Sequence, residues 1–386
     1  MQVSQIFSGT FIKRSHARLV ALFLLLTLVI LGSSGQVLAH GPKSSSVYVM
    51  NNDAAENAIL VFDRADDGTL TEAGSFATGG QGTGSGLGSQ GALVLSQNRH
   101  WLFAVNAGSN EVSIFATQGS NLILLDTVPS GGERPVSLTV NGRILYVLNA
   151  GGSGNITGFF IGRHGKLNPI PHSTKFLSNE GVGDAPGPAQ VSFTPNGRQI
   201  VVTEKATNQI LTYRVRRFGL LADPIVTASE GMTPFGFDFT RRGDLLVSEA
   251  FGGAENASAT SSYSFKHGQL KVVSSSVPTN QTAACWLVVS KDGKYAYTTN
   301  TGSSSVTGYK VNHDGSIALL DDDGVTGETS SGSRPIDAIF SKDGRNLYVL
   351  SGGTFTVTTF QIHADGSLTN LGDITVPAGS VGIAAR

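Results

Sequence analysis

Two glutamates and two arginines are the residues of this sequence whose types could support acid–base and anion-binding chemistry. Glu204 and Glu249 each end a mostly apolar run, and Arg134 and Arg334 each stand directly before a proline. A carboxylate in a recessed site can act as an acid or a base, because desolvation raises its pKa toward neutrality. A guanidinium can hold a carboxylate or phosphate with paired hydrogen bonds. These four side chains therefore predict a polar catalytic site. The alternatives are structural roles, at strand ends for the glutamates and between adjacent repeats for the arginines.

Four further residues lie at equivalent positions of the repeats described below. Asn149 and Asn300 end strands as Glu204 does, and Gln190 and Trp286 follow the starts of two expected inner strands. We predict that these four residues bind a ligand. Asn at a strand end can instead satisfy local backbone groups. A ring of Glu and Asn oxygens could also hold Ca²⁺, although no Asp-rich loop accompanies it.

The histidines stand away from the expected site. His164, His267, His313 and His363 fall at or near turns between outer strands. A nucleophile activated by histidine, or a Cys/His zinc site, is therefore not expected. The single cysteine, Cys285, is expected to be a small buried side chain.

A Gly/Ser-rich stretch, residues 79–91, contains the spacing G-x-G-x-x-G at Gly86, Gly88 and Gly91. A dinucleotide site needs a strand before this motif and a helix after it, and here a strand follows. We interpret the stretch as a flexible connection. The prediction is therefore of no cofactor and no bound metal.

These residues belong to a sequence repeat of about 45 to 53 residues that extends along the chain. Each unit has an apolar strand, an Asn-Gly or Asp-Gly type turn, a second strand, a small-residue loop, and two more strands joined by a turn. Strands at this period predict an all-β, seven-bladed β-propeller of four-stranded antiparallel blades. The starts of the inner strands align in one column: Gln90, Pro135, Pro188, Pro234, Ala284, Pro335 and Ser380.

The two ends of the repeat region are complementary. The first strand, residues 47–51, is of the second type and has no inner strand before it, whereas residues 381–385 form an inner strand with nothing after it. We predict that this C-terminal strand completes blade one and closes the ring, because an unpaired edge would otherwise remain.

The N-terminus predicts export. Lys13, Arg14 and Arg18 precede an apolar run over residues 19–31, and small residues follow at Val37-Leu38-Ala39. This pattern is typical of a secretory signal, and the run is short for a bilayer-spanning helix. We predict a signal peptide over residues 1–39, cleaved after Ala39, a propeller over residues 40–386, and a secreted or periplasmic location. An uncleaved membrane anchor is the alternative.

Charge gives little indication of a macromolecular partner. The formal net charge of the chain is −1, and it becomes −4 after residue 39 because the removed segment carries three cations and no acids. A mildly acidic protein has no electrostatic preference for nucleic acid or anionic lipid as a whole. We expect a monomer with a small-molecule ligand or substrate, with neither nucleic acid nor membrane as partner.

The repeats resemble the lactonase family of seven-bladed propellers, which includes 6-phosphogluconolactonase-like proteins and fungal carboxymuconate-lactonizing enzymes. The resemblance covers residues 47–386 and is carried by segments such as 188–199, 284–295 and 335–346. It implies hydrolysis of a small cyclic ester at the channel mouth. Glu204 or Glu249 would then activate water, and Arg134 or Arg334 would stabilise the oxyanion.

The sequence departs from the family where the family's enzymes often carry histidine at the start of inner strands. The matching positions hold Gly91, Ala92, Val136, Ala189, Gln190, Phe235, Cys285, Trp286 and Ile336. Two functions therefore stay open. The first is an exported lactonase-like hydrolase, and the second is a non-catalytic propeller that binds a protein, glycan or small ligand.

Overall fold

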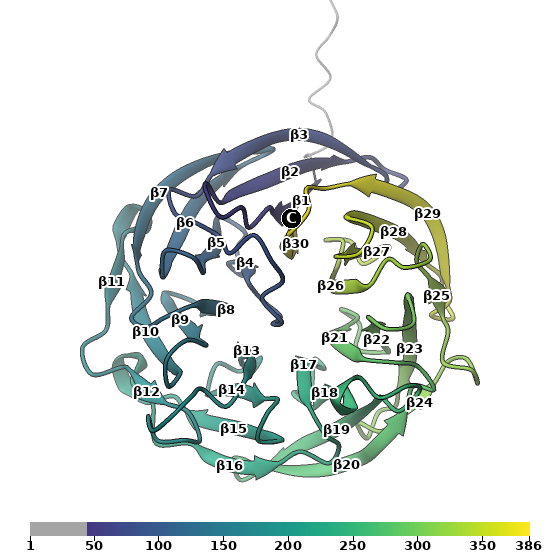
Figure 1. Ribbon diagram of the computed structural model, residues 1–386. Coiled ribbons are helices and arrows are strands. Elements are labelled where there is room, and N and C mark those ends of the chain that lie inside the picture. Colours follow the sequence, from purple (N-terminus) through teal and green to yellow (C-terminus); the bar gives the residue numbers. More distant parts are fainter. Residues whose placement is uncertain (1–44) are drawn as a thin grey trace, which may run out of the picture. The chain divides into compact units, whose positions relative to one another are not determined.

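Alternating apolar and polar residues, with Gly or Asn at the turns, fold this chain into short antiparallel strands. The computed structural model describes residues 45–386, and the predicted signal peptide lies outside them. Its strands form seven sheets of four strands, two of which carry one short extra strand. Figure 1 looks along the axis of the ring that the sheets form. The predicted all-β seven-bladed propeller is confirmed.

Each blade contributes one strand to each of four concentric layers. The innermost strands of blades one to seven are β30 (Val381–Ala385), β4 (Leu93–Leu95), β8 (Pro135–Asn141), β13 (Pro188–Phe193), β17 (Pro234–Phe239), β21 (Ala284–Val289) and β26 (Pro335–Phe340). The second strands, in the same order, are β1 (Ser45–Met50), β5 (Trp101–Asn106), β9 (Ile144–Asn149), β14 (Gln199–Glu204), β18 (Leu245–Glu249), β22 (Tyr295–Asn300) and β27 (Asn346–Ser351).

The third strands are β2 (Ala58–Arg64), β6 (Glu111–Gln118), β10 (Asn155–Ile161), β15 (Gln209–Arg214), β19 (Ala259–Lys266), β23 (Ser305–Val311) and β28 (Thr356–Ile362). The outermost are β3 (Leu70–Ala77), β7 (Asn121–Pro129), β11 (Leu167–Pro169), β16 (Ile225–Ala228), β20 (Gln269–Pro278), β24 (Ile317–Leu319) and β29 (Leu368–Thr375). The short extra strands are β12 (Lys175–Phe176) and β25 (Gly327–Glu328), and three single 3₁₀ turns complete the elements: η1 (Arg163–Gly165), η2 (Arg217–Gly219) and η3 (Phe251–Gly253). Across residues 45–386, no helical segment has the length and apolar character needed to cross a bilayer.

The C-terminal strand closes the ring as predicted. β30 pairs antiparallel with β1, and Val47, Tyr48 and Val49 lie opposite Ala385, Ala384 and Ile383. Figure 1 shows the yellow end of the chain against the purple strand β1. Every strand of the ring therefore pairs within residues 45–386, so a chain that begins at residue 40 keeps all seven blades.

Strand alternation divides the connections between two faces of the disc. We call the face that carries the tight turns, from first to second and from third to fourth strands, the turn face. The opposite face carries the second-to-third connections and the segments that enter each inner strand, and we call it the loop face. Antiparallel pairing in all seven sheets fixes this division.

A tyrosine in the second strand ties each of four blades to the next. Tyr146 donates a hydrogen bond to the carbonyl of Gly219 in blade four at 2.6 Å, and Tyr297 donates to Gly366 in blade seven at 2.7 Å. Tyr348 likewise donates to Gly68 in blade one at 2.9 Å. The acceptors stand at tight turns with positive φ, where glycine is favoured. These bonds explain the recurring Tyr-Val pair of the repeat.

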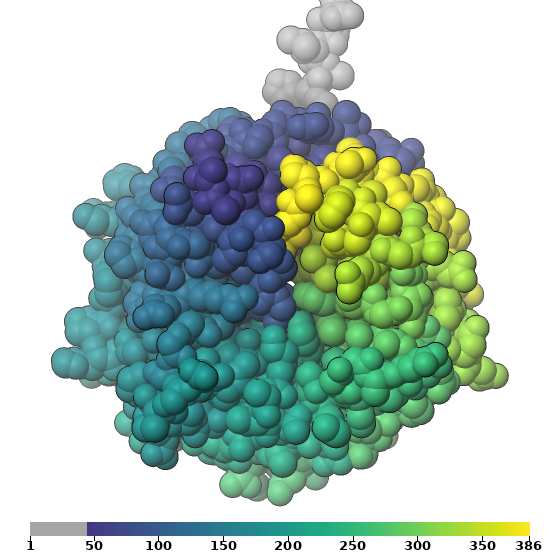
Figure 2. Space-filling model, viewed as in Figure 1, coloured from purple at the N-terminus to yellow at the C-terminus, as the bar shows by residue number. Residues whose placement is uncertain are grey.

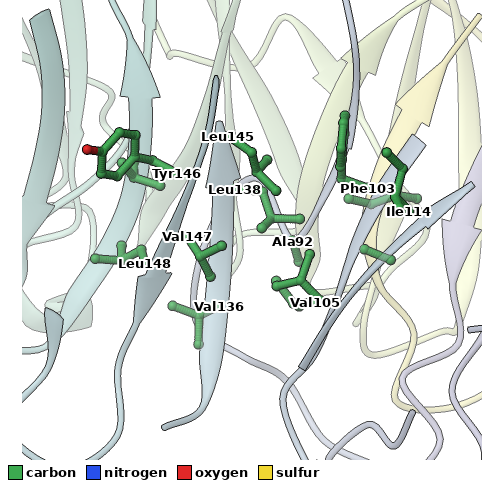
Figure 3. Close-up of a cluster of buried hydrophobic side chains, with 14 of the residues drawn as sticks. Ala92, Phe103, Val105, Ile114, Val136, Leu138, Leu145, Tyr146, Val147 and Leu148 are labelled. Carbon is green, nitrogen blue, oxygen red and sulfur yellow. The ribbon is translucent and has the colours of Figure 1, made fainter. Parts of the chain in front are cut away.

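The core lies between adjacent blades. Figure 3 shows the contact of blades two and three, where Phe103 and Val105 of β5 and Ala92 face Val136 and Leu138 of β8. These side chains are at most 2% exposed. Burial of a large apolar side chain contributes about 1.5–3 kcal/mol relative to exposure, so blade stacking holds the inner strands in fixed positions around the axis.

Candidate active site

The structure places Glu204 inside the sheet packing. Its carboxylate accepts hydrogen bonds from the Ser178 amide at 3.0 Å, the Ser178 hydroxyl at 2.5 Å and the Thr207 hydroxyl at 2.7 Å. Ser178 belongs to the connection that enters blade four, so the carboxylate joins a second strand to that connection. The side chain is fully buried and lines none of the cavities described below.

Glu249 has the same kind of environment one blade further. Its carboxylate accepts hydrogen bonds from the Gly231 amide at 2.9 Å, the Ser261 hydroxyl at 2.6 Å and the Ser276 hydroxyl at 2.7 Å. Burial raises the pKa of Glu249 although these bonds lower it. A Cβ at Gly231 would overlap this carboxylate, so the connection packs directly against it. The two glutamates therefore lie in separate blades, each enclosed by its own connection.

Asn149 and Asn300 repeat this arrangement. The Asn149 amide donates to Asn155 at 2.9 Å, and the Asn300 amide donates to Ser305 at 3.0 Å and Thr307 at 2.9 Å. Both side chains are fully buried. Such contacts fit the alternative that residues ending the second strands organise the loop face of each blade. Their predicted ligand contacts stay a prediction.

Arg134 and Arg334 are exposed on the loop face, each one residue before an inner strand. Both have positive φ, 51° and 50°, and Thr233 and Ala283 share this conformation at the same point of other blades. The Arg134 carbonyl accepts the Ala150 amide, and the Arg334 carbonyl accepts the Gly352 amide. The structure does not bring the arginines into a cavity with Glu204 or Glu249. Their catalytic role stays a prediction without geometric support.

The Gly/Ser-rich stretch closes the channel, so its interpretation as a flexible connection is wrong. Figure 1 shows the segment before β4 reaching the centre of the ring, and Figure 2 shows that atoms fill this region. The Gln90 side chain donates to the Leu287 carbonyl at 2.8 Å and accepts the Leu287 amide at 3.1 Å. Trp286 donates its indole N–H to the Ser89 carbonyl at 2.8 Å. These bonds join blade two to blade six across the axis. We call residues 85–90 the plug.

Two further residues accommodate the plug. A Cβ at Gly236 would overlap the Gln90 amide oxygen, so only glycine leaves room there. Lys205 donates to the Gly88 carbonyl at 2.5 Å, and its ammonium lies 4.7 Å from the centre of the Phe235 ring. Burial lowers the pKa of Lys205 to about 8. The predicted ligand residue Trp286 is thus a fixed contact of the plug.

The Gln190 side chain joins two neighbouring blades in the way that the Gln90 side chain joins blades two and six. Its side-chain amide donates to the Phe237 carbonyl at 2.9 Å and accepts the Phe237 amide at 2.7 Å, as a strand backbone would. Gln190 was expected beside the channel, and the structure places it in the wall of the channel cavity.

The channel holds a cavity of about 430 Å³ between the plug and the turn face. Its floor includes Gln90 and Gln190, and its mouth includes Arg99 and Pro195 at the first tight turns of blades two and four. The cavity therefore opens on the turn face, whereas Glu204, Glu249, Arg134 and Arg334 stand at the strand ends that belong to the loop face. A volume of this size accommodates a small organic ligand.

Two aspartates that were not predicted from the sequence line this cavity, Asp337 buried and Asp238 half-buried. Asp238 of β17 accepts the Val289 amide of blade six at 2.9 Å, and Asp337 of β26 accepts the Ile383 amide of blade one at 3.3 Å. Burial raises the pKa of Asp238 to about 6 and that of Asp337 to about 7, although the backbone hydrogen bonds lower both. Carboxyl groups with such pKa values exchange protons near neutral pH.

One cation, Arg99, lines the mouth of the cavity, and further cations lie close to it. Arg99 stands at the rim, and its pKa is lowered by burial and by the neighbouring Arg386. The pKa of Lys291 is lowered by burial and by the neighbouring Arg99 and Lys342. A basic rim above two carboxyl groups can attract an anionic ligand or a developing negative charge. No group of three or more His, Cys, Asp and Glu within residues 45–386 is placed to hold a metal ion.

Comparison with known proteins places this propeller in a family. The family described as "Lactonase, 7-bladed beta-propeller" matches residues 32–176 and 250–381, which is more than half of the chain. The protein therefore belongs to the lactonase family of seven-bladed propellers. The match omits residues 177–249, which contain Glu204, Asp238 and Glu249. Among curated proteins, none matches this sequence.

Solved structures with the same fold have low sequence identity to the chain. A Bacteroides uniformis protein, provisionally named a 6-phosphogluconolactonase, is 18% identical with a TM-score of 0.72, and the match covers 89% of this chain and 100% of that protein. The periplasmic gluconolactonase of Pseudomonas aeruginosa is 15% identical with a TM-score of 0.68, covering 89% and 98%. A Lactobacillus plantarum protein is 20% identical with a TM-score of 0.70, covering 89% and 100%. At these identities the similarity establishes the fold.

Proposed function

We propose that this protein hydrolyses a small lactone in the channel cavity that opens on the turn face. The observation that carries the proposal is that Asp238 and Asp337 both line one cavity of about 430 Å³. Membership of the lactonase family supports the reaction class. The gluconolactonase names of two structural neighbours fit the same class, although each name belongs to that neighbour alone.

The chemistry needs one carboxylate and one water molecule. Ionised Asp337 or Asp238 takes a proton from water while the water oxygen bonds to the lactone carbonyl carbon. The ester C–O bond then breaks, and the protonated aspartic acid returns the proton to the ring oxygen. The product is an open-chain hydroxy acid, which equals the lactone plus one water molecule. The cations at the rim favour the negative charge of the intermediate and of the product.

The two glutamates and two arginines that the sequence predicted as catalytic have no catalytic role in this proposal. Glu204 and Glu249 are enclosed by hydrogen bonds in separate blades, and Arg134 and Arg334 are exposed on the opposite face. We therefore assign water activation to the aspartates. The glutamates serve as comparison variants, because they are buried acids outside the cavity.

A lactone panel tests the proposed reaction directly. The protein spanning residues 40–386 would be incubated with aldonolactones and simple aliphatic lactones, and acid release would be followed by titration at constant pH. We expect turnover of at least one lactone. Failure with every member of the panel, for a protein with a native circular dichroism spectrum, would contradict the hydrolase.

A ligand-binding propeller is the second candidate function. It is favoured by one observation, namely that Asp238 and Asp337 each accept a backbone amide from a neighbouring blade and so have a structural task. Calorimetric titration with the lactones and their hydroxy acids separates the candidates. Binding without turnover would support the second candidate, and turnover would support the first.

We further propose that the protein acts outside the cytoplasm. The basic residues, the apolar run and the small residues before Ala39 support this location. Expression of the whole chain followed by N-terminal sequencing is expected to give a mature protein that begins at His40. Retention of residues 1–39 in a membrane fraction would support the uncleaved anchor instead.

A further inference from the structure

We propose that the turn face of blades three, four and five docks onto the surface of an anionic lipid bilayer. The docking surface, called here the basic sector, comprises the turns 141–143, 162–166, 194–198, 214–219, 240–244 and 266–268. This inference goes beyond the proposed hydrolysis and does not depend on it. Net charge alone predicted no membrane partner, because it averages over both faces of the disc.

Cations dominate the basic sector. Each of its six turns carries Arg or Lys, and Asp244 is the one acidic residue within them, while Asp223, which follows the turn 214–219, is paired with Lys175 at 2.7 Å. Asp244 is paired with Arg242 at 3.6 Å, which is the one ion pair found within these turns. The turn at 214–219 alone holds Arg214, Arg216 and Arg217, all exposed. Because the turns end at one face of the disc, a flat surface can contact all of them.

The loop face of the same three blades has the opposite charge. Its connections carry Glu133, Glu180, Asp184, Glu230 and Glu255, all of which are partly or fully exposed, against Arg134 and Lys205. A disc with this charge distribution orients near an anionic surface so that its turn face points toward that surface. The turns of blades six, seven and one lack this bias, because Asp292, Asp343 and Asp67 accompany their cations. The docking surface is therefore a sector to one side of the channel mouth.

Two exposed phenylalanines indicate a lipid interface more than a soluble polyanion. Phe218, at the tip of η2, is 73% exposed, and the Arg217 guanidinium lies 4.6 Å from its ring centre. Phe160 is 42% exposed, and the Arg143 guanidinium lies 4.6 Å from its ring centre. Aromatic rings enter the boundary between headgroups and acyl chains while neighbouring arginines bind phosphate groups. Aromatic rings also stack on bases and sugar rings, so an acidic polysaccharide is tested below as the alternative occupant.

Vesicle sedimentation tests this proposal. The protein spanning residues 40–386 would be mixed with phosphatidylcholine vesicles with and without phosphatidylglycerol, at low salt and at physiological salt. We expect binding only to vesicles that contain phosphatidylglycerol, with weaker binding as salt increases. Equal binding to both kinds of vesicle, or no binding at low salt, would overturn the proposal.

Matched variants locate the interaction. R216E/R217E is expected to reduce the partition coefficient by on the order of 30-fold or more, since each cation near an anionic membrane contributes about fivefold. F218S should reduce it by about threefold or more while leaving the salt dependence unchanged. R134E/R334E makes the same charge change on the loop face and should bind as the parent protein does. Equal loss in both double variants would contradict a sector-specific surface.

A column of acidic polysaccharide completes the test. Salt-dependent retention on the column, with no binding to phosphatidylglycerol vesicles, would replace the membrane with a soluble polyanion and so overturn the proposal. The substituted side chains are exposed at turns, so each variant is expected to keep the native fold. Circular dichroism of each variant verifies this.

Discussion

At the scale of single residues, the strand that carries an acid separates the acids that can exchange protons with a ligand from those that hold the fold. Glu204 and Glu249 are enclosed by serine and threonine hydroxyls, whereas Asp238 and Asp337 line a cavity. Glu204, Glu249 and Asp337 are all buried, so burial alone does not identify the site. What differs is the strand, because only the inner strands border the channel.

Asp337 predicts a pH dependence of stability. Its pKa is raised to about 7 from the model-peptide value of 3.8, so the folded protein holds the proton more tightly than the unfolded chain does. Its contribution is then fully present below about pH 4 and is lost as pH rises to about 7. Denaturant titration should show that D337N flattens the decline in unfolding free energy across this window. An unchanged slope in D337N would contradict the assignment.

The sequence identified the inner-strand position of Gln190 but not the two aspartates. Asp337 has φ of 50° and stands at a register shift between Ile336 and Ala338. This irregularity breaks the simple alternation by which a strand residue's direction is inferred from sequence. Glu204 and Glu249 were predicted to be catalytic because Glu is unusual at a strand end. Except for Thr207, the hydroxyls that contact them lie 12 to 27 residues away in the sequence, at Ser178, Ser261 and Ser276, so no local pattern reveals these bonds.

At the scale of elements, the plug determines which face of the channel is open. Residues 85–90 join three inner strands, because the Gln90 amide donates to Ala189, the Ser137 hydroxyl donates to Gln90, and the Gln90 side chain bonds to Leu287. The composition of this stretch indicated flexibility, since Gly and Ser have little side chain to pack. Backbone and amide hydrogen bonds across the ring fix it instead.

Removal of the Gln90 side chain tests the plug. Q90A leaves the buried Leu287 amide and carbonyl without partners, so we expect a loss of roughly 2–4 kcal/mol in unfolding free energy. Q97A removes an exposed glutamine near the same cavity and should change the value by less than about 0.5 kcal/mol. Equal stability of both variants in urea titration would show that the plug is not held as described.

At the scale of the whole molecule, the ring was the most predictable feature. Repeat length, turn residues and complementary termini together predicted seven blades and the pairing of the last strand with the first, and β30 pairs with β1 accordingly. The charge difference between the faces was not predicted. It becomes visible only when each turn is assigned to its side of the disc.

Deletion of the closing strand tests the ring. A chain ending at Gly379 loses the buried Val381, Ile383 and Ala384 and exposes the edge of β1. We expect aggregation or loss of near-ultraviolet circular dichroism, because an unpaired edge strand templates further pairing. Deletion of Arg386 alone is the control and should leave a folded monomer on gel filtration. A folded, monomeric chain without β30 would contradict the closure.

We propose that the channel aspartates perform the chemistry of this lactonase-family propeller. The most direct measurement is the initial rate of lactone opening by the parent protein and by D238N, D337N, E204Q and E249Q, each verified as folded. The account predicts a loss of about 100-fold or more in kcat for D337N, D238N or both, with kcat in the two glutamate variants nearly unchanged. Full activity in both aspartate variants, or the loss confined to E204Q or E249Q, would contradict it.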